Sequence, residues 1–186
     1  VEYGGQFESE AAASRTLFLT SLISILLIFL ILYHEFRSLP LSGIIMLNLP
    51  LAIIGGIIAI WFTSGVISIP AIIGFISLFG IATRNGILLV SHYNQLQNEG
   101  LSLTDSIIQG SLDRLNPILM TALTSALALI PLALGGDLPG NEIQSPMAQV
   151  ILGGLLSSTL LNGFVVPIVY YLLNRKQKNA LYRNNA

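Results

Sequence analysis

The sequence contains no cysteine and very little charge. Only 9% of its 186 residues are Asp, Glu, Lys or Arg, whereas soluble domains carry about 25%. The missing cysteines exclude disulfides and thiolate metal sites, and they leave the redox compartment open. The low charge excludes an ordinary soluble domain, because the water-facing surface of a soluble domain is rich in charged groups. A net charge of −1 without a basic block gives no indication of nucleic-acid binding.

Three further signals are missing. Residues 1–14 lack the basic start and apolar core of a secretory signal. The sequence does not begin with Met, so we expect it to be part of a longer protein. It also lacks a nucleophile elbow, paired carboxylates and a metal-ligand cluster. The sequence therefore predicts neither an enzyme nor a cofactor.

Long apolar intervals dominate what is present, and 53% of the residues are hydrophobic. About 20 helical residues cross the ~30 Å hydrocarbon core of a bilayer. We therefore expect an all-α integral membrane bundle in the lipid bilayer, with five spans at about 16–33, 41–62, 69–93, 115–134 and 147–173. A polar lead-in segment at 1–15 and a basic tail at 175–186 flank the membrane domain, which runs over 16–174.

The connection between the third and fourth spans has a pattern of its own. Ser102 and Asp105 form the hydroxyl and carboxylate of a capping box. Apolar residues after them recur at helical spacing. This pattern predicts a short amphipathic helix over about 102–114 that lies along the membrane surface.

The positive charges favour one orientation. Five spans place the two ends of the chain on opposite sides of the membrane, and Arg15 alone lies on the first side. Six basic residues fall on the other side: Arg37, Arg114, Arg175, Lys176, Lys178 and Arg183. The positive-inside rule therefore predicts a cytoplasmic C-terminus and an N-terminus outside.

Arg84 is the residue around which the functional prediction is built. It interrupts an uncharged stretch that runs from Ser38 to Ser91. A charged side chain at mid-membrane costs roughly 2.5–3.5 kcal/mol on insertion scales, so it is kept facing a bundle interior, a partner or water. Thr83 and Asn85 add hydrogen-bonding groups beside it. The alternative is an arginine that snorkels to one surface and only anchors its helix.

Other polar residues lie inside the predicted spans. Asn48 is favoured as an interhelical hydrogen-bond donor, and Pro50 after it is expected to kink the second span. Thr121, Thr124 and Ser125 share one face of the fourth span. Their hydroxyls either bond to carbonyls one turn back or form a polar stripe that faces Arg84.

Four stretches resemble one known family. The run GIATRNGILLVSHY at 80–93 resembles the tenth membrane helix of resistance–nodulation–division (RND) efflux pumps, and it is most similar to the heavy-metal branch of cobalt–zinc–cadmium and copper–silver exporters. GQFES at 5–9 resembles the lead-in to the eighth helix. MLNLPLA at 46–52 and RLNPILMT at 114–121 resemble parts of the ninth and eleventh helices. The resemblance covers essentially the whole chain.

The resemblance implies a fold and a mechanism. The five spans would correspond to the last five of twelve in a homotrimeric inner-membrane pump, which exports substrate against inward proton flow through a periplasmic adaptor and an outer-membrane channel. Arg84 and Thr121 match a lysine and a threonine of the proton relay in the multidrug branch. Because arginine keeps its proton, it can hold a carboxylate but is a poor proton carrier. The acidic partner would come from the remainder of the parent transporter.

The transported cation and the alternatives stay open at this point. Copper and silver would favour a ladder of soft thioether ligands. Because Met46, Met120 and Met147 form no spaced stripe, the sequence slightly favours zinc, cobalt, nickel or cadmium as the transported cation. His92 is interpreted as a polar residue at a helix end rather than a metal ligand. The alternatives are an RND drug or hydrophobe exporter and a freestanding membrane assembly module without transport. An upstream reading frame that encodes seven more spans would exclude the module.

Overall fold

The computed structural model describes residues 4–63, 65–136 and 138–184, with side chains described within 11–175. Over these ranges every regular element is a helix. The elements are α1 (Gly4–Phe36), α2 (Leu39–Met46), α3 (Asn48–Phe62), α4 (Ile69–Asn98), α5 (Leu103–Leu134) and α6 (Gln144–Asn184). Five units are long and apolar enough to cross a membrane, with α2 and α3 together forming one. The predicted all-α bundle of five long apolar helices is confirmed.

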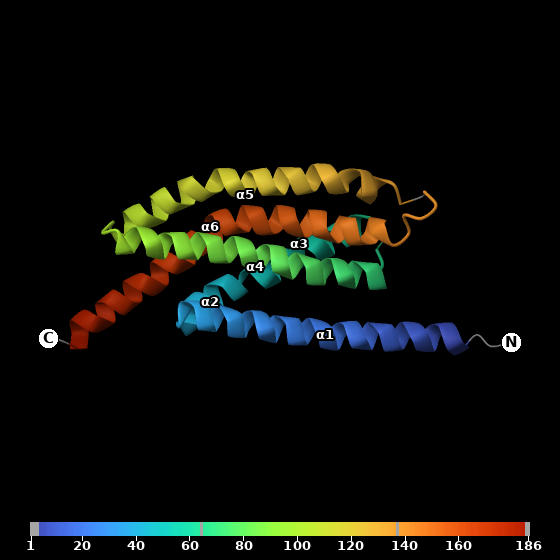
Figure 1. Ribbon diagram of the computed structural model, residues 1–186, viewed down its shortest axis with the longest axis horizontal. Helices are drawn as coiled ribbons and strands as arrows, with labels where there is room; N and C mark the ends of the chain where they lie inside the picture. Colours follow the sequence, from blue (N-terminus) through green and yellow to red (C-terminus); the bar gives the residue numbers. More distant parts are fainter. Residues whose placement is uncertain (1–3, 64, 137, 185–186) are drawn as a thin grey trace.

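The helices run up and down along one common direction, as Figure 1 shows. In this view α1 and α5 lie at the two edges, with α4 and α6 between them. Helix α6 packs against α3, α4 and α5, whereas α1 contacts α2 and α4. Helices α1 and α5 are therefore peripheral, and the packed centre is built from α3, α4 and α6.

The second predicted span is two helices rather than one. Helix α2 ends at Met46 and α3 begins at Asn48, with a turn at Leu47 between them. Pro50 has no N–H to donate to the carbonyl of Met46, so the helical ladder is interrupted there. The interruption expected from Pro50 is present, and α2 and α3 together still form one apolar unit over Leu39–Phe62 that is long enough to cross a membrane.

Two predicted surface segments are also helical continuations of spans. Residues 4–15 of the lead-in belong to α1, and residues 103–114 belong to α5. The capping box is confirmed, because Ser102 Oγ accepts a hydrogen bond from the Asp105 N–H at 3.2 Å. The helix that begins there, α5, does not end near residue 114 but continues to Leu134. Pro117 lies inside it and removes only one backbone hydrogen bond. The prediction of a separate short helix over 102–114 is therefore wrong, because these residues begin α5, and their placement along the membrane surface stays a prediction.

Glycines bring α3 and α6 close together. A methyl group at Gly55 would lie 2.4 Å from the carbonyl oxygen of Gly153, so only glycine allows this approach. One turn further along α6, Ser157 Oγ donates to the carbonyl of Leu51 at 2.8 Å. Gly55 thus lets α3 approach α6, whereas a methyl group at the adjacent Gly56 would lie 2.6 Å from the ring of Phe75 in α4.

Helices α4 and α6 run parallel and in register. Gly154 of α6 lies against Leu78 of α4, and the Tyr170 hydroxyl donates to Asn94 Oδ1, 76 positions away in the chain. The same offset of 76 separates both pairs of residues. Each α6 residue between these contacts therefore lies at the depth of the α4 residue 76 positions before it.

Candidate functional site

Arg84 lies in the middle of the 30-residue helix α4, with its side chain on the exposed face of the chain. Within the described residues it makes no hydrogen bond or ion pair. The exposed residues of α4 form one stripe at helical spacing, namely Ile73, Ser77, Gly80, Arg84, Leu88, Ser91, Gln95 and Asn98. Both α1 and α5 pack against α4. Arg84 therefore points away from the core of this chain, and an acidic partner outside it stays a prediction.

The two neighbours of Arg84 in sequence are buried. Thr83 is 7% exposed and Asn85 is 3% exposed. Successive residues of a helix lie about 100° apart around its axis, so these side chains leave α4 on opposite sides of Arg84. The Thr83 hydroxyl has no hydrogen-bond partner. The tripeptide thus presents a cation outward and two polar groups inward at one depth.

Asn48 lies against the same part of α4. It is 1% exposed, and a methyl group at Gly86 would lie 2.5 Å from its Nδ2 atom. That nitrogen has no hydrogen-bond partner. The interhelical hydrogen bond expected from Asn48 is therefore not made by its amide nitrogen, and close packing against Gly86 takes its place.

Sequence reasoning missed Asn162 of α6. This side chain is 1% exposed, and neither Oδ1 nor Nδ2 has a hydrogen-bond partner. The register of α4 and α6 places it at the depth of Gly86. An available signal was an asparagine near the middle of the charge-free interval 143–174.

The hydroxyls of α5 bond within their own helix. Thr121 Oγ1 donates to the carbonyl of Pro117 at 2.9 Å, and Thr124 Oγ1 donates to that of Met120 at 2.8 Å. Ser125 is half-buried. Across the described part of the chain, no hydrogen bond joins these residues to Arg84. The local alternative, hydroxyls bonded one turn back, is confirmed for the two threonines.

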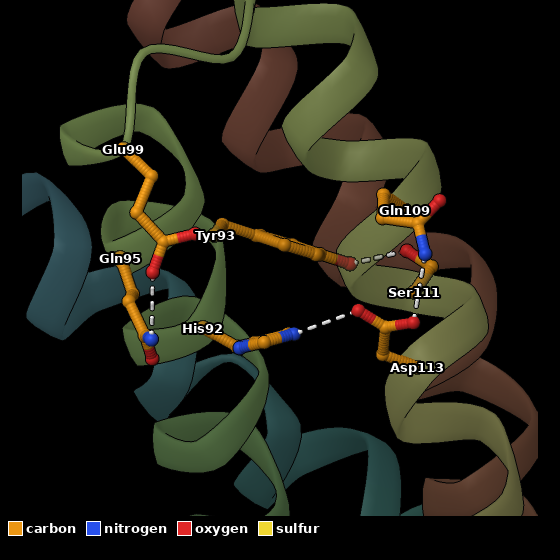
Figure 2. A network of polar contacts seen from close by, with 7 residues as sticks. All are labelled: His92, Tyr93, Gln95, Glu99, Gln109, Ser111 and Asp113. Carbon is orange, nitrogen blue, oxygen red and sulfur yellow. Dashed lines mark hydrogen bonds and ion pairs between the residues drawn. The ribbon is translucent and has the colours of Figure 1, made fainter.

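A polar network joins α4 to α5 near their connecting loop (Figure 2). His92 Nε2 lies 3.1 Å from Asp113 Oδ2, and Gln109 donates to the other oxygen of Asp113 at 2.9 Å. Tyr93 and Ser111 share a hydrogen bond of 2.6 Å between their hydroxyls. No group of three metal-ligating side chains occurs in the part of the chain that was described. The network holds the two helices together at this corner.

These features define a class of protein. Five apolar helices, with a lone arginine halfway along one and amides buried at its depth, are typical of a multi-pass membrane transporter. A profile of the AcrB/AcrD/AcrF family matches residues 1–174. The chain therefore belongs to this family of RND efflux transporters, which is a family of transporters rather than of classical enzymes.

Several relatives are heavy-metal resistance proteins. The cobalt–zinc–cadmium resistance protein of Cupriavidus metallidurans is 38% identical over 96% of this chain and 17% of its own length. The nickel–cobalt–cadmium resistance protein of Alcaligenes xylosoxydans is 35% identical over 96% of this chain and 16% of its own length. A crystal structure of a heavy metal efflux pump superposes with a TM-score of 0.81 and 32% identity, over 94% of this chain and 18% of that one.

Another relative is a multidrug resistance protein. The multidrug resistance protein MdtC of Erwinia tasmaniensis is 35% identical over 92% of this chain and 16% of its own length. The resemblance to heavy-metal RND pumps is confirmed by these comparisons together. The chain spans about one sixth of the length of the relatives that it matches.

Proposed function

We propose that this chain contributes to the proton path of an RND antiporter that exports heavy-metal cations from the cell in exchange for protons. The observation that carries the proposal is Arg84, an unpaired cation at the middle of α4 on a stripe that also contains Gly80 and Ser91. A lipid-facing stripe would contain neither an arginine nor small polar residues. The exposed stripe of α4 is instead suited to packing against another helix of the transporter.

The proposed role of Arg84 is that of a fixed counter-charge. Its guanidinium stays protonated, so it favours the ionised form of a carboxylate that the rest of the transporter brings to the stripe. When that carboxylate takes up a proton, the ion pair is lost and the two helices can separate. The side chains that offer hydrogen-bonding hydroxyl and amide groups along the proposed proton path are Thr83, Asn85 and Thr121. Inward proton flow is thereby converted into a movement of α4.

The proposal includes a cellular arrangement. The transporter is a homotrimer in the bacterial inner membrane and works with a periplasmic adaptor and an outer-membrane channel. The N-terminus is periplasmic and the C-terminus is cytoplasmic, as the excess of Lys and Arg at one end of the bundle favours. Divalent cations such as zinc, cobalt, nickel or cadmium are the proposed substrates, in keeping with the names of the relatives.

Substitution of Arg84 in the whole transporter tests this function. Arg84→Ala is expected to abolish metal resistance and metal-driven proton flux in proteoliposomes, because the carboxylate loses its counter-charge. Trimer assembly, measured by native electrophoresis, is expected to be unchanged. Arg175→Ala removes the same charge from an exposed position at the C-terminal end of the apolar segment of α6 and is the matched control. Resistance that persists in Arg84→Ala at normal expression would contradict the proposal.

Drug export is the second candidate, and the identity to the multidrug resistance protein MdtC favours it. The two candidates share Arg84 and differ in the transported molecule. A panel of metal salts and hydrophobic drugs, given to cells that express the whole transporter, separates them. Drug resistance without metal resistance would favour this second candidate.

A further inference from the structure

Three asparagines from three helices occupy the interior of the bundle. Asn48 of α3, Asn85 of α4 and Asn162 of α6 are each at most 3% exposed. Asn48 packs against Gly86, which directly follows Asn85. Asn162 lies at the depth of Gly86 by the register of α4 and α6. The three amides therefore share one layer, which is also the depth of Arg84.

Asn162 is the least satisfied side chain of this layer. Both of its polar atoms are buried without a hydrogen-bond partner, and so is Nδ2 of Asn48. Leaving a buried polar group unpaired costs about 1–3 kcal/mol. Its neighbours on the buried stripe of α6 include Leu155 and Val166, so an apolar residue would suit the position. An asparagine there needs a partner, and ordered water is the usual one for an unpaired buried group.

Tight contacts between α4 and α6 lie on both sides of the layer along the bundle axis. Toward the start of α6, Gly154 lies against Leu78 so closely that a methyl group on the glycine would clash. Toward its end, the rings of Tyr93 and Tyr170 pack with their centroids 5.1 Å apart. Each contact lies eight residues from Asn162, roughly 12 Å along α6, so the two contacts mark the limits of the interface section that contains the layer.

We propose that Asn162, together with Asn48, binds ordered water in the interface of α3, α4 and α6, and that Asn162 is thereby a positioning residue of the proton path. The inference rests on the proposed function. An amide donates and accepts hydrogen bonds, so it can hold water in a fixed orientation. This water lies on the inner side of α4, where it supports Thr83 and Asn85 behind the exposed Arg84.

An isosteric pair of variants in the whole transporter tests the inference. Asn162→Thr keeps a hydroxyl that can bind water, whereas Asn162→Val has the same shape without one. We expect Asn162→Val to lower metal-driven proton flux by roughly tenfold and Asn162→Thr to keep most of it. Thermal unfolding of both variants is measured beside the flux, and similar unfolding temperatures are expected because each variant carries a β-branched side chain of the same size.

Ser158→Ala is the matched control. Ser158 lies one turn away on the same buried stripe, and its hydroxyl already donates to the carbonyl of Leu155 at 3.2 Å. Its loss is expected to leave proton flux unchanged. Equal flux in the valine and threonine variants of Asn162, or an equal loss in Ser158→Ala, would overturn the inference.

A structure of the whole transporter that resolves water gives an independent readout. Water within hydrogen-bond distance of Asn162 Oδ1 or Nδ2 is expected, and a dry site or a protein partner for both atoms would refute the proposal. If Arg84→Ala abolishes proton flux while Asn162→Val retains it, the Asn162 inference alone fails. If Arg84→Ala retains flux, the proposed function itself fails.

Discussion

The contact between Gly86 and Asn48 gives a quantitative test of the packing at the depth of Arg84. A methyl group at Gly86 would lie 2.5 Å from Asn48 Nδ2 and 3.0 Å from Ile45 Cγ2. In an open helix, replacing glycine by alanine stabilises by about 1 kcal/mol. Overpacking a tight interior costs about 1–3 kcal/mol. Gly86→Ala is therefore expected to destabilise the protein by up to roughly 2 kcal/mol.

A double-mutant cycle isolates the amide. Asn48→Ala removes the nearer obstacle and leaves the Ile45 methyl group at 3.0 Å, which needs to shift by only a few tenths of an ångström. Gly86→Ala made in the Asn48→Ala background is expected to be neutral or stabilising, which corresponds to a coupling energy of about 1–3 kcal/mol. The measurement is equilibrium or thermal unfolding of the whole transporter in detergent, with all four proteins compared under one condition.

The control for this cycle is Gly43→Ala in α2. No atom lies within 4 Å of the position that its methyl group would take, so this change is expected to stabilise or to have no effect. Suppose instead that Gly86→Ala stabilises as much as Gly43→Ala, or that its effect is the same with and without the Asn48 amide. Then Asn48 does not pack against Gly86, and the shared layer of amides is wrong.

Two further predictions concern the faces of α4. Gly80 lies on the exposed stripe with open space around it, so Gly80→Leu fits within this chain but is expected to impair transport, because the stripe faces another helix of the transporter. Unchanged transport would place the stripe against lipid. Asp113→Ala removes the bridge from His92 and is expected to speed hydrogen exchange in the loop between α4 and α5. Gln95→Ala, which lies within α4 and loses only a contact to the Glu99 side chain at the C-cap, should leave that exchange unchanged.

The number and helical type of the membrane spans could be predicted from the sequence because the signal is local. Apolar intervals that are long enough to cross a bilayer and are separated by polar segments define five spans without any knowledge of the tertiary contacts. The capping box at Ser102 and Asp105 was equally local, and it marks the start of α5. The end of α5 at Leu134 agrees with the end expected for the fourth span. Its continuity from Leu103 through Pro117 was not predicted, because packing decides whether a helix continues past a proline.

The sequence by itself determined that Arg84 lies halfway along an apolar helix, since depth follows from counting residues at 1.5 Å each. Only the tertiary structure decided that it points away from α3 and α6, because the direction of a side chain depends on which neighbours cover its helix. The same holds for Asn162, whose burial arises from the register between α4 and α6. Contacts between residues 76 positions apart leave no local pattern, so the layer of asparagines became visible only when the helices were packed.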